Sequence, residues 1–147
     1  MITLDFVKEC LDILDLDYKE LDDNSVVVIF SDKRCFDYAI ATIIHVNPDN
    51  SALSFRSQAL DYQPKGDLYA MANRHNCRSH MPACHINSDG EVIMDRIYNL
   101  DNEVSPHYIL NNIIRPCVFL PIEAFVNFEY DDDHMRERIK KLNNPDQ

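Results

Sequence analysis

The side chains best suited to chemistry gather in one stretch, where five residues of zinc-ligand type fall within eleven positions: His75, Cys77, His80, Cys84 and His85. Structural zinc takes four converging cysteine or histidine ligands, usually as two closely spaced pairs on tight turns. The spacing here is irregular, and Cys84 and His85 are neighbours on a predicted strand, so their side chains point to opposite faces. We therefore expect packing and loop roles for these residues. The alternative is a metal-binding sensor or enzyme that uses the His75–His85 cluster.

Nucleophilic and acid–base chemistry has less support. Cys77 could pair with His75 or His80, but the sequence offers no evident third group to orient such a pair. A cysteine that packs as a small apolar residue is the simpler interpretation. The acidic runs Asp22–Asp23 and Asp131–Asp133 stand at expected turns and helix starts, where carboxylates accept hydrogen bonds from backbone amides. We predict no catalytic, cofactor-binding or metal-binding residues and no enzymatic activity.

Glycine content excludes several common sites. The chain has two glycines, Gly66 and Gly90, so it lacks the spacing that lets backbone amides approach phosphates in nucleotide-binding loops. The motifs Gly-x-Ser-x-Gly and His-Glu-x-x-His are absent as well. We therefore expect no nucleotide-binding loop, no hydrolase nucleophile elbow and no metalloprotease helix.

Length and charge narrow the class of protein. The chain has 147 residues, 46% of them hydrophobic, which is enough for one domain with a real core. Its net charge of −11 works against nucleic acid and anionic membranes, both of which bind clustered Lys and Arg. We expect no membrane span, since the longest apolar stretch, Cys117–Val126, is interrupted by Pro121 and Glu123. The five cysteines are odd in number and scattered, which favours free thiols in the cytoplasm.

Hydrophobic periodicity predicts the elements that position these residues. Helices are expected over 3–16, from Pro64 through His75, and from Ser105 onward, because apolar residues recur there at helical spacing. Strands are expected at 18–21, 25–30, 36–46, 52–58, 84–87 and 91–100, with Asp89-Gly90 in the turn of the last hairpin. The predicted fold class is α+β: an antiparallel sheet with helices packed on it, in the order helix, strands, helix, hairpin, long helix.

Three segments raise questions that periodicity leaves open. Val26–Phe30 is apolar at every position, so both faces of this strand should be covered, by the chain's own helices or by another subunit. Pro116 and Pro121 should kink the last helix, and a stop at Arg115 followed by a second helix is the alternative. Residues 131–147 are predicted to be a charged helical segment with a frayed tail, following a domain of residues 1–130.

Three motifs together resemble the YbjN-like domain, a small bacterial family sometimes labelled a sensory transduction regulator. They are a helix that ends in a spaced pair of asparagines, a strand followed by an Asp-Gly turn and a return strand, and a Ser-Pro helix start: Leu68–Asn76, Cys84–Val92 and Ser105–Leu110. The resemblance covers about Thr3 to Glu129. It implies a type III secretion chaperone-like fold, a homodimer, and binding to segments of other proteins, with no catalytic residues. The chain departs from the family through Pro116, Pro121 and its His/Cys-rich loop.

These observations lead to one expected function. We expect a non-enzymatic, chaperone-like regulatory protein of the bacterial cytoplasm that binds a segment of an unidentified partner protein. Apolar surface beyond the core of one monomer is where second copies and partners attach, and the strand Val26–Phe30 and the apolar last helix offer such surface. A stabilising subunit of a larger assembly would have the same sequence features. No cofactor, nucleic acid or membrane is expected as a partner.

Overall fold

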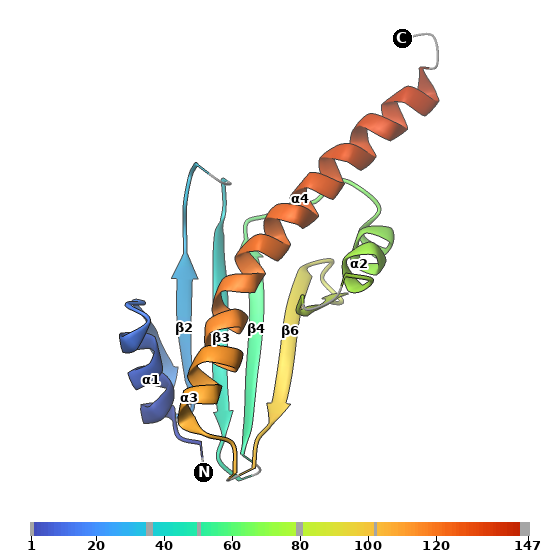
Figure 1. The fold of residues 1–147 in the computed structure, drawn as a ribbon. Helices are drawn as coiled ribbons and strands as arrows, with labels where there is room; N and C mark the ends of the chain where they lie inside the picture. Colours follow the sequence, from blue (N-terminus) through green and yellow to red (C-terminus); the bar gives the residue numbers. More distant parts are fainter. Residues whose placement is uncertain (1, 35–36, 50, 79–80, 102, 145–147) are drawn as a thin grey trace.

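A six-stranded antiparallel sheet with its helices on one face forms the fold (Figure 1). The computed structural model describes residues 2–34, 37–49, 51–78, 81–101 and 103–144. The sheet has the order β1-β2-β3-β4-β6-β5, with β1 Lys19–Asp22, β2 Ser25–Phe30, β3 Ala39–Asn47, β4 Ala52–Leu60, β5 Ala83–Ile86 and β6 Val92–Asn99. The helices are α1 Leu4–Ile13, α2 Leu68–Asn76 and a continuous run of α3 Pro106–Tyr108, the π-helical η1 Ile109–Ile114 and α4 Arg115–Asn143. The predicted α+β class is confirmed.

Local sequence signals explain where the helices begin. Thr3 caps α1, since its hydroxyl accepts a hydrogen bond from the Phe6 amide at 3.2 Å, and Ser105 caps the last helical run in the same way through the Tyr108 amide at 3.2 Å. The predicted start of α2 at Pro64 was too early. Its cap is Asp67, whose carboxylate accepts from the Ala70 amide at 3.2 Å. The last hairpin turns at Gly90 as predicted, with φ of +77°.

The strand register decides which side chains face the helices. Val26 lies opposite Ile44, and Ile44 lies opposite Phe55, so these three form one row across the inner face. The core then divides into two groups of buried side chains. One group lies beneath α1 and η1 and includes Val7, Leu11, Val26, Ile44, Phe55, Ile113 and Ile114. The other lies between α2, α4 and the far end of the sheet and includes Ile40, Met71, Met94, Phe125 and Phe128.

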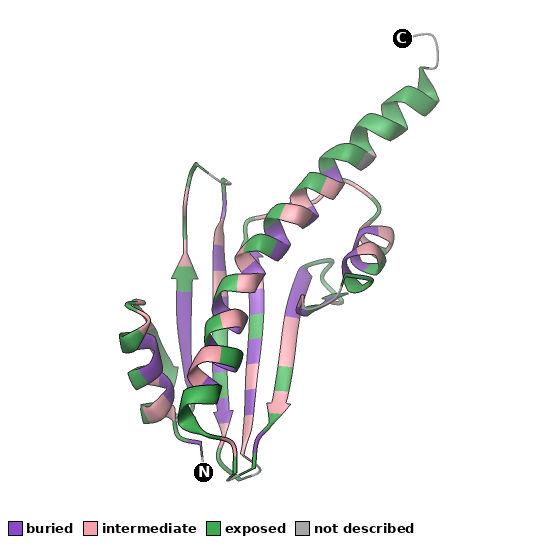
Figure 2. Ribbon diagram, viewed as in Figure 1, coloured by how far each residue is buried: buried purple, intermediate pink, exposed green. Residues whose placement is uncertain are grey.

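The outer face of the sheet has no helix on it among the described residues (Figures 1 and 2). This bears on what covers the two faces of the apolar strand Val26–Phe30. Val28, on the inner face, is 5% exposed, whereas Ile29, on the outer face, is 50% exposed. The alternative in which the chain's own helices cover both faces is therefore wrong, and coverage by another subunit stays a prediction. Of the predicted third strand, Phe36 lies outside the described residues, as does the neighbouring Cys35.

The last helix passes through both prolines without a stop. The alternative that ends it at Arg115 is wrong. The helix accommodates Pro116 through the π-helical segment η1 directly before it. In this segment the Arg115 amide donates to the Leu110 carbonyl, five residues back. A π-helical turn changes which carbonyls require a donor, so a residue that lacks an N–H group can follow it within a continuous helix.

Residues 131–143 are helical, as predicted, but they are the end of α4 and not a separate segment. The acidic run Asp131–Asp133 lies within the helix, and Asp132 is only 3% exposed. Its carboxylate accepts hydrogen bonds from the backbone amides of Lys65, at 3.1 Å, and Gly66, at 2.5 Å. Asp132 therefore connects α4 to the loop between β4 and α2. The predicted frayed tail includes residues 145–147, which lie outside the described residues.

Candidate functional site

The described histidines and cysteines of the 75–85 stretch lie apart. His75 is fully buried, and its Nε2 lies 2.8 Å from the Pro82 carbonyl oxygen, to which it donates. Its Nδ1 has no hydrogen-bond partner in the described part of the chain. Burial lowers the pKa of His75, and the nearby Arg78 guanidinium acts in the same direction. The side chain is therefore a neutral, buried part of α2.

The remaining members of this stretch point in different directions. Cys84 is buried on the inner face of β5, whereas His85 lies on the outer face, with its Nδ1 3.7 Å from the Asp95 carboxylate. Cys77 is exposed at the end of α2, and His80 lies outside the described residues. Among the described residues, no three His, Cys, Asp or Glu side chains come together to hold a metal ion. Burial raises the pKa of the Cys84 thiol to about 12, which works against a nucleophilic thiolate.

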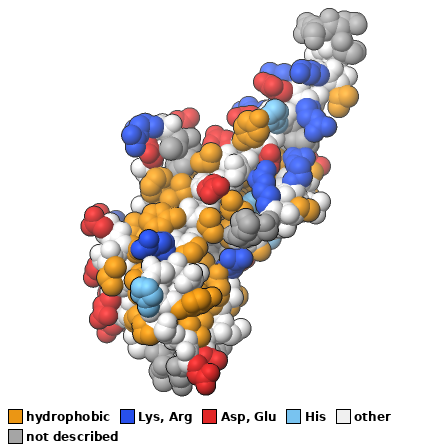
Figure 3. All heavy atoms as spheres, viewed as in Figure 1, with side chains coloured by type: hydrophobic (Ala, Val, Ile, Leu, Met, Phe, Trp, Pro, Cys, Tyr) orange, Lys and Arg blue, Asp and Glu red, His pale blue; other side chains and the backbone are white. Residues whose placement is uncertain are grey.

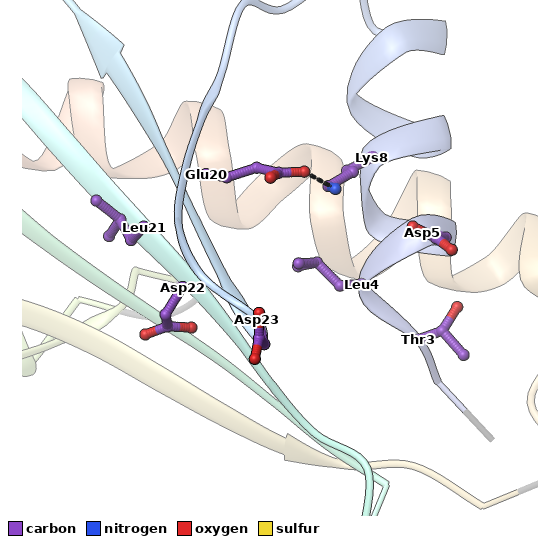
Figure 4. Close-up of a pocket in the computed structure, with 8 residues that line it drawn as sticks. All are labelled: Thr3, Leu4, Asp5, Lys8, Glu20, Leu21, Asp22 and Asp23. Carbon is purple, nitrogen blue, oxygen red and sulfur yellow. Dashed lines mark hydrogen bonds and ion pairs between the residues drawn. The ribbon is translucent and has the colours of Figure 1, made fainter.

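An open acidic hollow of about 540 Å3 lies between α1 and β1 (Figure 4). The carboxylates of Asp5, Asp22 and Asp23 stand apart around it and do not converge on one point. The amino group of Lys8 is paired with Glu20. The Asn24 amide donates to Asp22 at 2.8 Å, and this bond is the main cause of the lowered pKa of that carboxyl. These groups thus stabilise a turn and a helix edge, and we assign no ligand to the hollow.

A second depression has an apolar lining and is the candidate site. This depression, the α4 cleft, has a volume of about 220 Å3 and is bordered by the segment after α1, the end of β2, part of β3 and the middle of α4. Its lining residues are Asp15, Leu16, Asp17, Val28, Ile29, Phe30, Ile40, Thr42, Val118, Phe119 and Ile122. Figure 3 shows hydrophobic side chains gathered on this face of the molecule, over β2 and the adjoining part of α4.

The end of α1 places the acidic rim of the cleft. The Asp15 amide donates to the Asp12 carbonyl and the Leu16 amide to the Leu11 carbonyl, both at 3.0 Å. This pair of bonds is a Schellman motif, which ends a helix with one residue in the left-handed conformation. That residue is Asp15, with φ of +57°. The turn directs Leu16 toward the core, where it packs against the α1 group of buried side chains, and leaves Asp15 and Asp17 exposed at the rim.

The cleft suits apolar side chains better than a small polar ligand. Phe119 is 42% exposed on its wall, while Phe30 and Ile122 are half-buried. The hydroxyl of Thr42 on its floor is already hydrogen-bonded to Ser57 at 2.7 Å. Small-molecule pockets measure roughly 300–1,000 Å3, and a cavity of roughly 150 Å3 holds a benzene-sized group. The α4 cleft therefore has room for one aromatic or two aliphatic side chains.

Charge is distributed unevenly around this cleft. Residues 5–23 contain eight acidic and two basic side chains, whereas residues 134–144 contain four basic and one acidic. In Figure 3 acidic side chains line the α1 edge of the molecule, and basic ones gather along the last turns of α4. An approaching segment with basic residues is therefore attracted to the α1 side of the cleft.

Sequence patterns had singled out two walls of the cleft but not the cleft itself. Val26–Phe30 and the apolar last helix were both recognised as sources of surplus apolar surface. The rim was missed, because glycine is the usual signal for a left-handed helix end and Asp15 stands there instead. None of the four described residues of the 75–85 cluster lines the cleft.

By length and composition, the helical run Pro106–Asn143 could also cross a membrane, and 44% of its most apolar stretch is buried inside the fold. This run is longer than the stretch Cys117–Val126 considered from sequence alone, because the helix continues through both prolines. A core helix packed on a sheet has the same composition, so we draw no conclusion about a membrane from it.

Comparisons with protein-family models, with curated proteins and with solved structures found no match for this chain. The resemblance to the YbjN-like domain and the similarity to type III secretion chaperones therefore stay predictions.

Proposed function

We propose that this protein is a non-enzymatic, chaperone-like interaction module that binds a segment of another protein in the α4 cleft. The observation that carries this proposal is an apolar cleft, with Phe119 42% exposed on its wall, beside an acidic rim at Asp15 and Asp17. Apolar anchors that fill a small pocket, surrounded by charges that steer the approach, are typical of protein–protein recognition. The expected ligand is a segment with one aromatic or two aliphatic side chains next to Lys or Arg.

Two further properties belong to this proposal. The described cysteines, Cys10, Cys77, Cys84 and Cys117, are free thiols, which supports a reducing compartment such as the bacterial cytoplasm. The resemblance to the YbjN-like domain supports a regulatory role, exerted by binding a segment of the partner protein. Binding in the α4 cleft depends on neither the compartment nor the regulatory role.

Capture from the lysate of the native host, compared between matched variants, tests the proposal. Phe119→Glu places a charge in the cleft, whereas Tyr69→Glu makes the same kind of change on α2, at a side chain that is 75% exposed and does not line the cleft. We expect the wild type and Tyr69→Glu to capture the same protein at comparable yield, and Phe119→Glu to lose at least about 90% of it, a tenfold change. Circular dichroism and thermal unfolding confirm that each variant is folded.

The captured protein then provides a second test. A fragment of it that competes for binding should contain large apolar residues next to Lys or Arg, and its affinity should fall as salt is raised. Equal capture by Phe119→Glu and by the wild type would show that partners bind elsewhere and would overturn the assignment of the cleft.

A further inference from the structure

The apolar side of α4 continues beyond the sheet that covers it. Apolar residues at positions 114, 118, 125, 128, 139 and 142 follow the alternating spacing of four and three that places them on one side of a helix. Ile114, Phe125 and Phe128 are fully buried. Ile139 and Leu142, further along the same side, are 44% and 80% exposed. One side of α4 is thus apolar along its whole length, but the described residues of the chain cover only the part that ends near Phe128.

The unsupported part, residues 133–143, is called the α4 tip. It projects away from the sheet (Figure 1) beyond Asp132, whose carboxylate accepts hydrogen bonds from the Lys65 and Gly66 amides. A helix of this length extends about 16 Å, and most helical stability in proteins comes from packing of the apolar side against other elements. Docking on an apolar surface would stabilise the tip.

Charge indicates which surface fits the tip. Around Ile139 and Leu142 the tip has four basic side chains: Arg136, Arg138, Lys140 and Lys141. The α4 cleft has an apolar lining and an acidic rim at Asp15 and Asp17, next to an α1–β1 region in which acidic residues outnumber basic ones. The tip therefore has the features expected of the ligand of the cleft: two aliphatic side chains with basic neighbours.

The tip cannot occupy the cleft of its own chain. Ile122, on the cleft wall, and Ile139 belong to the same uninterrupted helix. Seventeen residues separate them, which corresponds to about 25 Å along the helix axis. A continuous helix does not fold back on itself, so a tip that fills an α4 cleft must come from another molecule.

We propose that the occupant is a second copy of this chain, and that two copies exchange their α4 tips. A two-fold axis perpendicular to the sheet makes the two α4 helices antiparallel and keeps them in one layer. In that arrangement the apolar side of each tip, which continues the sheet-facing side of its own α4, also faces the sheet of the other copy. Ile139 and Leu142 enter the cleft beside Phe119 of the second copy, and the basic side chains lie against Asp15 and Asp17. Both clefts are then filled.

This inference rests on the proposed function, since it names an occupant for the same cleft. It adds a regulatory consequence. A partner segment and the tip of the second copy compete for one surface, so self-association restrains partner binding, and a partner of higher affinity converts the dimer into a complex.

Sedimentation velocity of the full-length protein, at concentrations from about 1 to 100 µM, tests the inference. We expect the wild type and the control Tyr69→Glu to form dimers. Ile139→Asp combined with Leu142→Asp, which alters two exposed tip positions, and Phe119→Glu in the cleft should each weaken the dimer at least about tenfold. Raising NaCl from about 0.05 to 0.5 M should also weaken the wild-type dimer. A wild type that stays monomeric, or tip and cleft variants that dimerise normally, would overturn the inference.

Mixing the two variants gives the most specific result. The tip variant has an intact cleft and the cleft variant has an intact tip, so one of the two contacts can form between them. The mixture should contain a heterodimer at concentrations where each variant alone is monomeric. Absence of a heterodimer, when both variants retain wild-type helical content, would contradict tip exchange. Asp17→Lys combined with Arg138→Glu provides a further check, because reversing both charges should restore dimerisation that Asp17→Lys alone weakens.

Failure of tip exchange and failure of the proposed function are distinguishable. If the cleft binds partners as proposed, the tip variant Ile139→Asp/Leu142→Asp still captures the partner from lysate, with a higher yield than the wild type because its cleft is free. A monomeric wild type whose partner capture depends on Phe119 would refute tip exchange alone. A dimer that depends on the tip, in a protein whose partner capture is insensitive to Phe119→Glu, would refute the partner-binding function alone.

Discussion

The two halves of α4 have the same apolar spacing and different surroundings. In the first half, Phe125 and Phe128 are fully buried between the sheet and α2. In the second half, Ile139 and Leu142 lie on the same side of the helix but are 44% and 80% exposed. Helical periodicity therefore identifies which side of a helix is built for contact, while the length of the sheet decides how much of that side is covered within one chain.

The largest expected difference between the two halves is in stability. Phe125→Ala removes a fully buried aromatic ring and should lower the free energy of unfolding by about 3–5 kcal/mol. Leu142→Ala removes a side chain that is 80% exposed and should change it by less than about 0.5 kcal/mol. Urea unfolding at low protein concentration, where the monomer dominates, measures both. A comparable loss for Leu142→Ala would mean that the tip is packed within the monomer.

The junction of the two halves gives a smaller effect with a closely matched control. Asp132 is buried and accepts hydrogen bonds from the Lys65 and Gly66 amides. Asp132→Asn replaces one accepting oxygen with a donor that faces those amides and should lower the free energy of unfolding by about 1.5–3 kcal/mol. Asp133 has a side chain that is 58% exposed and pairs with Arg136, so Asp133→Asn should have an effect below about 0.5 kcal/mol. Unfolding of both variants at pH 7 tests this, and equal losses would contradict the anchoring role of Asp132.

The smallest effect concerns His75, a buried histidine of α2, compared with His134 on the tip. Burial lowers the pKa of His75 from 6.5, so below about pH 6.5 the unfolded chain binds a proton that the folded chain does not. The contribution of His75 to the free energy of unfolding is fully present above that pH and is lost as the pH falls through the folded pKa. The free energy of unfolding then changes by at most about 1.4 kcal/mol per pH unit.

Denaturant unfolding between about pH 5 and 7.5, across the ordinary histidine pKa, measures this slope. His75→Leu should remove it, and His134→Gln, a change on the exposed tip, should retain it. Burial raises the pKa of Glu129, which gives that carboxyl the opposite dependence on pH. The difference between the wild type and His75→Leu cancels this contribution. Parallel pH curves for these two proteins would show that His75 is not the titrating group.

Local signals in the sequence were sufficient for most elements. The caps Thr3 and Ser105, the Asp89-Gly90 turn and the alternation along the strands predicted the α+β class and the element order. The last helix continues through both prolines as predicted, with a π-helical segment directly before Pro116, and only the alternative stop at Arg115 is wrong. The prediction for residues 131–133 failed because a distant contact replaced a local rule. The run Asp131–Asp133 suggested a new helix start, yet Asp132 serves as an acceptor for backbone amides far away in sequence.

By itself, the sequence determined the class of fold, the apolar sides of its helices, the acidic and basic ends of the chain, and the exclusion of common nucleotide-binding and hydrolase motifs. These properties depend on residue type and on short-range spacing. Only the tertiary structure decided that the described helices share one face of the sheet, that His75 and Cys84 are core residues, and that Asp15, Phe30 and Phe119 meet around one cleft. The physical reason is that contacts between elements depend on strand register and helix length, and neither is encoded within a single local segment.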